Sequence, residues 1–91
     1  MADYILVRHK IRDFTKWKSV YESNSHKRSA AGLIELNVLQ NTNDPNEVVL
    51  LFKTNDLTLA KTYIESRELI QIMLKAGVAD KPDIYFLKDS N

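Results

Sequence analysis

The 91-residue sequence lacks several features that would indicate a particular chemistry. With no cysteine, it has no disulfide framework, no thiolate metal site and no cysteine nucleophile. Its only glycines, Gly32 and Gly77, cannot form a phosphate-binding loop or a dinucleotide fingerprint, and no serine lies in a nucleophile elbow. The only histidines, His9 and His26, do not have the spacing of a recognised ligand pair. We therefore expect neither a metal nor a cofactor.

Strong charge of one sign and long apolar runs are also missing. Thirteen basic and twelve acidic residues give a net charge of +1, which argues against nucleic acid as a partner. No run is long enough to span a membrane, and the first residues lack the basic region of a signal peptide, so a cytoplasmic location is the default expectation. The apolar content of 44% is that of a soluble globular protein.

The length predicts a single domain over residues 1–91, with a core of modest size. A small chain without disulfides commonly gains further burial by oligomerisation.

Two kinds of periodicity alternate along the first half of the chain. Residues 4–11 alternate between apolar and polar faces and predict a strand, with His9 on the apolar face. Asp13 is a candidate N-cap for a helix that continues to a stop at Gly32. Residues 33–40 are strand-like, and the turn formers of 41–47 predict a hairpin.

The second half repeats this order. Residues 48–52 are five consecutive apolar residues, which is typical of a strand covered on both faces. Asn55 or Asp56 can cap a helix, and Ser66 can cap another that ends at Gly77, unless the two are one kinked helix. Residues 84–87 form a short final strand.

The order β-α-β-β-α-β predicts a ferredoxin-like α+β fold, a four-stranded antiparallel sheet with its helices on one face. Depending on register, the other face carries Val49 and Leu51, or Val48, Leu50 and Phe52. Either set is apolar, and an exposed apolar patch usually marks an interface. We therefore predict a homodimer that pairs sheet to sheet.

Several local strings resemble the antibiotic biosynthesis monooxygenase-like family of dimeric α+β barrel proteins, and the resemblance spans nearly the whole chain. The strings are YILVRHK at 4–10, DF and WK at 13–14 and 17–18, Arg28 with AAG at 30–32, DPNEVV at 44–49, and KAGV with DKPDIYFL at 75–78 and 80–87. The resemblance is to small stand-alone members whose function is mostly unassigned. It implies a dimer with a pocket between helices and sheet in each subunit. The chemistry of characterised family members includes cofactor-free oxygenation of phenolic polycycles, haem breakdown and polyketide cyclisation, and the resemblance implies chemistry of this range.

One position departs from that family. Members often carry a histidine where this chain has Asn24, and the nearby histidine here is His26. At about 100° per residue, His26 points away from the helix stripe that contains Trp17 and Tyr21, so its role is not carried over.

Polar residues on apolar faces are the candidates for function, because burying a polar group without a partner is costly. His9 could accept a proton and Asn24 could orient a substrate oxygen, which makes them the candidate catalytic pair. Arg28 could hold an enolate or carboxylate, while Trp17 and Tyr21 could form an aromatic wall for a small aromatic ligand.

Each of these residues also has a structural interpretation. His9 could be a satisfied structural histidine, and Trp17 and Tyr21 could be core residues. Arg28 could extend its guanidinium to the edge or pair with an acidic group. Tyr63 and Tyr85 are taken as packing or interface residues.

Three functions remain open from the sequence. The first is a homodimer with a small-molecule pocket between helices and sheet. The second is a cofactor-independent monooxygenase or cyclase acting on a small aromatic or polyketide-like substrate. The third is a structural or regulatory dimer without catalysis.

Overall fold

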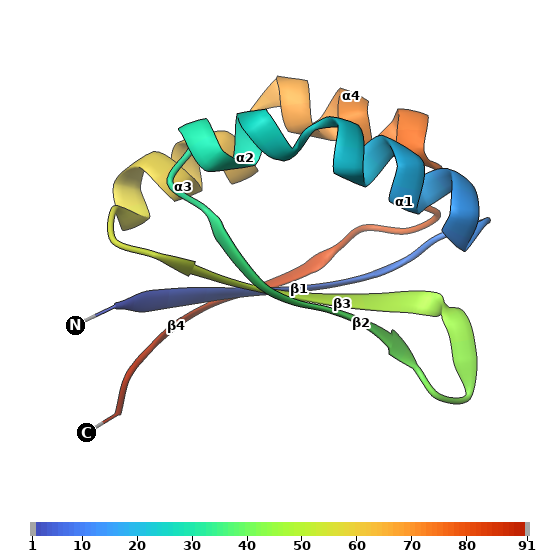
Figure 1. Ribbon diagram of the computed structural model, residues 1–91, viewed down its shortest axis with the longest axis horizontal. Coiled ribbons are helices and arrows are strands. Elements are labelled where there is room, and N and C mark those ends of the chain that lie inside the picture. The colour runs from blue at the N-terminus through green and yellow to red at the C-terminus, as the bar shows by residue number, and fades with distance from the viewer. Residues whose placement is uncertain (1, 91) are drawn as a thin grey trace.

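A computed structural model describes residues 2–90 of the chain (Figure 1). Strands and helices follow one another in the predicted ferredoxin-like order, except that each predicted helical region is divided in two. The elements are β1 (Asp3–Lys10), α1 (Phe14–Ser23), α2 (Ser25–Ala30), β2 (Ile34–Asn41), β3 (Asp44–Thr54), α3 (Leu57–Ile64), α4 (Arg67–Ala76) and β4 (Asp83–Lys88).

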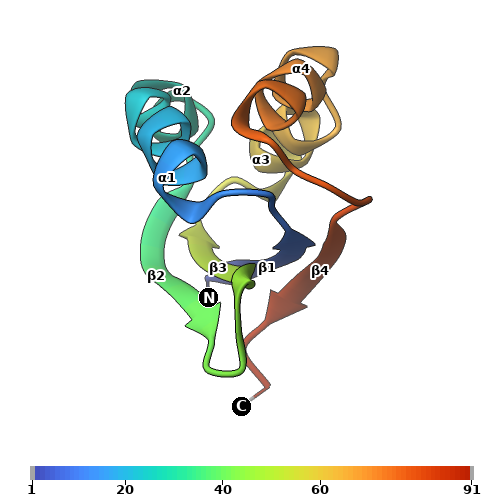
Figure 2. The ribbon, with the colours of Figure 1, turned by 90° about the vertical axis from the view of Figure 1, so that its right-hand side faces the viewer.

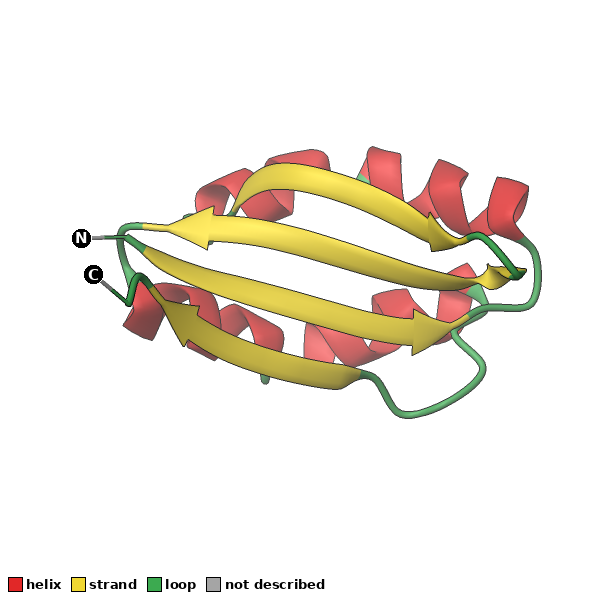
Figure 3. Cartoon of the chain, turned by 90° about the horizontal axis from the view of Figure 1, so that it is seen from below, coloured by secondary structure: helices red, strands yellow, loops and turns green. Residues whose placement is uncertain are grey.

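The four strands form one antiparallel sheet in the order β2-β3-β1-β4. All helices lie on one face, α1 with α2 above the β2 side and α3 with α4 above the β4 side (Figure 2). Seen from below, the opposite face of the sheet has no helix over it (Figure 3). The predicted fold class is therefore confirmed.

The strand register decides which residues face the helices. His9 of β1 pairs with Val48 of β3, and Val7 pairs with Leu50. These four side chains are buried beneath the helices, so alternation along each strand places Val49 and the other odd-numbered residues of β3 on the uncovered face. Of the two registers that the sequence allowed, the one exposing Val49 and Leu51 is therefore correct.

The first helical region breaks at Asn24, whereas the sequence pattern predicted one helix up to Gly32. Asp13 does cap α1, because its carboxylate accepts a hydrogen bond from the Thr15 amide at 3.0 Å. At Asn24 the backbone leaves helical geometry, with φ −107° and ψ 16°. The Asn24 side chain and the Ser23 hydroxyl each donate to the Val20 carbonyl at 2.8 Å, in place of the backbone hydrogen bond that this carbonyl loses where the helix breaks.

The second helical region is two helices rather than one kinked helix. Asp56 caps α3 and Ser66 caps α4, each through a side-chain oxygen that accepts a hydrogen bond from the Leu59 or Leu69 amide. Gly77 follows α4 with φ 84°, the left-handed conformation that ends many helices. Among the described helices, none is both long and apolar enough to cross a membrane.

Candidate functional site

His9 lies near the end of β1, on the face of the sheet that the helices cover. Its side chain is 3% exposed, and neither ring nitrogen has a hydrogen-bond partner in the described part of the chain. The ring is tilted against Trp17, with the two centroids 5.7 Å apart. Burial lowers the pKa of His9, and the negative charge of Asp80 opposes this shift only in part. The imidazole is therefore neutral at pH 7, with one nitrogen able to donate and the other able to accept.

Trp17, Tyr21 and Arg28 form a stack beneath α1 and α2. The rings of Trp17 and Tyr21 are nearly parallel, with centroids 4.9 Å apart and an angle of 16°. The guanidinium of Arg28 lies over the Tyr21 ring, with its central carbon 3.6 Å from the ring centroid. Arg28 Nη1 also donates to the Tyr21 carbonyl at 2.6 Å. The stack holds Arg28 at the inner side of the helix layer.

The Tyr21 hydroxyl points outward, to the edge strand β2. It donates to Glu35 Oε1 at 2.7 Å. Burial and this hydrogen bond raise the pKa of Tyr21, so the phenol keeps its proton. Its role in the structure is that of a donor tying α1 to β2.

A cavity of about 70 Å³ lies between the two rows of helices and the sheet. Its wall is mostly apolar and includes four polar side chains, His9, Tyr21, Arg28 and Tyr63. The other residues around it are Val7, Leu33, Leu50, Phe52, Ile64, Leu69, Met73 and Ile84. We call this space the inner cavity. It brings together three of the five residues that the sequence singled out, and Trp17 contacts two of those three.

Tyr63 is a member of this site that the sequence interpretation treated as packing. Its hydroxyl is buried and has no hydrogen-bond partner within residues 2–90. Burial raises the pKa of Tyr63, although the nearby charge of Arg28 opposes the shift. The signal was present in the sequence, because Tyr63 lies on the same helix face as the buried Ala60 and Ile64, where a hydroxyl needs a partner.

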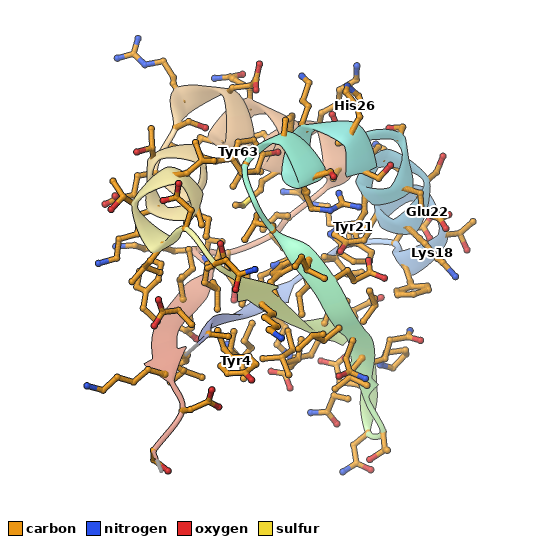
Figure 4. The ribbon with its side chains drawn as sticks, turned by 60° about the vertical axis from the view of Figure 1, so that its left-hand side comes forward. Tyr4, Lys18, Tyr21, Glu22, His26 and Tyr63 are labelled. Atoms are coloured by element: carbon orange, nitrogen blue, oxygen red, sulfur yellow. The ribbon has the colours of Figure 1, made fainter. Side chains whose placement is uncertain are left out.

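A larger opening adjoins the inner cavity from the outside, between α1, α2 and β2. This outer groove has a volume of about 610 Å³ and includes Lys18, Glu22 and Glu35 in its wall. Tyr21 and Arg28 line both spaces and therefore form the partition between them. Figure 4 shows Tyr21 beneath the helix, close to Lys18 and Glu22.

Asn24 does not join the other candidates. It lines neither the inner cavity nor the outer groove, and its amide donates to the Val20 carbonyl and, at 3.4 Å, to Ser23 Oγ. His26 is exposed on α2 and points away from the sheet in Figure 4, as the helix geometry predicted. Among residues 2–90, no cluster of three or more His, Asp or Glu residues could hold a metal ion.

The face of the sheet without helices, here called the free face, carries a band of apolar side chains. Leu6, Val49 and Leu51 are partly buried at its centre, and Ile34, Leu39, Tyr85 and Leu87 are exposed around them. At one end, Arg8 forms ion pairs with Glu47 and Asp83, and Lys10 pairs with Asp44.

Comparison with known proteins adds to this geometry. No family model matches the sequence, and the search of curated proteins found no match. Among solved structures, a conserved protein of Methanosarcina mazei is 15% identical with a TM-score of 0.75, over 99% of this chain and 94% of that one. A protein of Caulobacter crescentus, provisionally named an antibiotic biosynthesis monooxygenase, is 11% identical with a TM-score of 0.76, over 99% and 91%.

A third similar structure is SnoaB, a cofactor-independent oxygenase of Streptomyces nogalater. It is 11% identical with a TM-score of 0.74, over 99% of this chain and 94% of that one. Sequence identities this low show a shared fold and nothing more. The chain has the ferredoxin-like α+β fold of the proteins named antibiotic biosynthesis monooxygenases, as its sequence motifs predicted.

Proposed function

We propose that the protein binds a small organic molecule in the inner cavity and works as a homodimer paired through the free face. The observation that carries the binding proposal is that two buried polar side chains of the cavity wall, His9 and Tyr63, have no hydrogen-bond partner among residues 2–90. Leaving a buried donor or acceptor unsatisfied costs about 1–3 kcal/mol. A guest that bonds to both groups removes this cost, which favours binding in the cavity.

The free face supports the dimer. Antiparallel sheets with one solvated face usually carry polar side chains there, whereas this face is mainly apolar. Large exposed apolar patches mark interaction sites. Pairing with a second copy would cover Leu51 and its neighbours and leave the ion pairs of Arg8 at the rim, the usual arrangement of an interface.

A thermal-shift screen with small phenols, alcohols and carboxylic acids tests the binding proposal. A binder raises the midpoint of unfolding in proportion to RT ln(1 + [L]/Kd). We expect the shift to shrink in His9→Ala and in Tyr63→Phe. Asn24→Ala is the matched control, because Asn24 lies outside the cavity wall; if Asn24 orients the ligand instead, this variant loses the shift as well. Absence of a shift with any compound would leave only the structural or regulatory dimer.

A cofactor-independent oxygenase or cyclase is the second candidate. The neutral imidazole of His9 favours it, since a neutral histidine can take a proton from a bound substrate. Deprotonation would leave an electron-rich anion able to reduce molecular oxygen, and SnoaB of the same fold is named a cofactor-independent oxygenase. Oxygen uptake with any binder found in the screen, measured against His9→Ala, tests this activity.

A further inference from the structure

Two tyrosines close the inner cavity on different sides, and their side chains are held very differently. Tyr21 separates the cavity from the outer groove. Its ring lies between the ring of Trp17, at 4.9 Å, and the guanidinium of Arg28, at 3.6 Å. Its hydroxyl donates to Glu35 at 2.7 Å. Moving Tyr21 aside would break all three contacts, so the cavity is firmly closed on this side.

Tyr63 closes the cavity toward a second groove, which lies between α2 and the row formed by α3 and α4. This interhelical groove has a volume of about 380 Å³. Its lining residues are Lys27, Ala30, Ala31, Leu59, Thr62, Tyr63, Ser66 and Glu68. Tyr63 lines both the groove and the inner cavity, and Figure 4 shows it between the two rows of helices. Tyr63 is therefore the partition between these two spaces.

The side chain of Tyr63 has none of the contacts that hold Tyr21. Within residues 2–90 its hydroxyl has no hydrogen-bond partner, and its ring belongs to none of the aromatic or cation–π pairs. Across the groove stand only the small side chains of Ala30 and Ala31. Rotation of Tyr63 toward the groove breaks no hydrogen bond and lets a buried hydroxyl reach water, which removes the cost of leaving it unbonded.

The helices around the interhelical groove are also the less firmly packed part of the helix layer. The two rows pack against each other mainly through α1 and α4. At the groove, α2 ends, α3 ends and α4 begins, and segments with few packing contacts open locally at low free energy. One ion pair bridges the groove, between Lys27 of α2 and Glu68 of α4 at 3.5 Å. Both side chains are partly exposed, and such a pair is weak and easily broken.

We propose that a guest enters the inner cavity through the interhelical groove by rotation of Tyr63, and that the ion pair of Lys27 and Glu68 holds this entrance closed. This inference rests on the proposed function of the inner cavity and adds the control of access to it. Lys27 and Glu68 then set the rate at which a guest enters and leaves. Because salt screens an exposed ion pair, access should become faster as the ionic strength rises.

The rate at which a thiol in the cavity wall reacts with a small reagent measures access directly. The chain has no cysteine, so one introduced cysteine is its only thiol. Val7→Cys places it in the cavity wall, and Val48→Cys places it on the same buried face of the sheet, outside that wall. The reagent is methyl methanethiosulfonate, which is small and uncharged, and mass spectrometry follows the reaction. We expect Val7→Cys to react faster, because Val48→Cys is reached only when the fold opens.

Substitutions at the two partitions locate the entrance. In the Val7→Cys protein, Glu68→Gln or Lys27→Gln should raise the reaction rate about two- to fivefold, the effect of losing an exposed ion pair. High salt should raise the rate in the Val7→Cys protein itself but add little in Glu68→Gln. Glu35→Gln is the matched control, because it removes one carboxylate at the other partition while its amide oxygen still accepts the hydrogen bond of Tyr21. It should leave the rate unchanged.

The outcomes separate the entrance from the binding function. If Glu68→Gln leaves the rate at Val7→Cys unchanged, the ion pair does not control access, and if Tyr21→Phe alone raises it, the entrance is at the outer groove. If Glu68→Gln raises the rates at Val7→Cys and Val48→Cys equally, it loosens the whole fold, which contradicts a local entrance. A thermal-shift screen without any binder, beside the expected reaction rates, would remove the binding function and leave the entrance standing.

Discussion

His9 is the residue whose chemistry depends most on its surroundings. On an exposed strand it would carry a proton for part of the physiological pH range. Here the helices remove it from water, so that the neutral ring lies in the wall of the inner cavity, and neither nitrogen has a hydrogen-bond partner among the described residues. A residue in this state lowers the stability of the empty protein and raises its affinity for a guest that completes the hydrogen bonds.

Burial of His9 makes stability depend on pH in the mildly acidic range. The pKa of His9 is lowered on folding from 6.5, so below that pH the unfolded chain binds a proton that the folded protein excludes. Stability should therefore fall as the pH decreases from about 7 to 5. The pKa values of Asp44 and Glu47 are also lowered, but they act at more acidic pH, because the ordinary pKa values of these carboxyl groups are 3.8 and 4.5.

Urea unfolding at a series of pH values measures this dependence. His9→Leu should be nearly flat between pH 7 and 5, whereas the exposed His26→Gln should keep the slope of the unmodified protein. A slope that survives in His9→Leu would contradict the assignment.

Tyr21 and Tyr63 form a matched pair for measuring how much a hydroxyl contributes to stability with and without a hydrogen-bond partner. Tyr63→Phe removes a buried hydroxyl without a partner and should stabilise the unliganded protein, by at most about 1–3 kcal/mol. Tyr21→Phe removes the hydrogen bond to Glu35 and should destabilise it by about 1 kcal/mol. Urea midpoints at pH 7 give both values, and a destabilised Tyr63→Phe would mean that its hydroxyl is satisfied in solution.

At the scale of the elements, the helix ends follow local chemistry closely. Asp13, Asp56 and Ser66 each satisfy a free amide at the start of a helix, and Gly77 supplies the left-handed turn after α4. These residues fix where the helices begin and end, and the same helices form part of the wall of the inner cavity.

At Gly77 the effect of a positive φ on stability can be measured separately from the effect of side-chain crowding. A Cβ added there would meet Arg12 Cβ at 3.9 Å, an ordinary contact, so crowding is not an obstacle. The positive φ alone should make Gly77→Ala less stable by about 1–2 kcal/mol. Gly77→Asn should recover part of the loss, since asparagine tolerates this conformation better. Equal stability of the three proteins in thermal unfolding would refute this account.

The same elements mark the limit of prediction from the sequence. Strand alternation, caps and turn formers are local, and they identified the fold class and most boundaries. The hairpin was an exception, because β3 begins at Asp44, inside the turn predicted over 41–47, and continues to Thr54. The break at Asn24 was missed because the apolar stripe runs on to Arg28 and Ala31, and nothing local in the pattern requires the helix to end. Tyr63 was missed because membership of the cavity depends on six other elements that meet around it.

The whole molecule presents one covered and one free face, and the proposed dimer pairs through the free face. In the proposed dimer, Leu51 of β3 lies near the centre of the interface. Leu51→Lys should convert the dimer into a monomer, because it would bury an unpaired charge. Leu74→Lys is the control, since Leu74 is an exposed leucine of α4 on the opposite layer. Light scattering after size-exclusion chromatography checks both, and a monomeric unmodified protein at micromolar concentration would contradict the dimer.

The position of β1 in the sheet also has a consequence for how the molecule forms. β1 lies between β3 and β4, and Arg8 bonds to Glu47 on one side and to Asp83, 75 positions away, on the other. Contacts so distant in sequence require a long loop to close before they contribute, which slows folding. During synthesis, β1 would leave the ribosome early and wait for β4 with one edge unpaired. We expect the sheet, and with it the cavity and the free face, to be completed only when the C-terminal strand arrives.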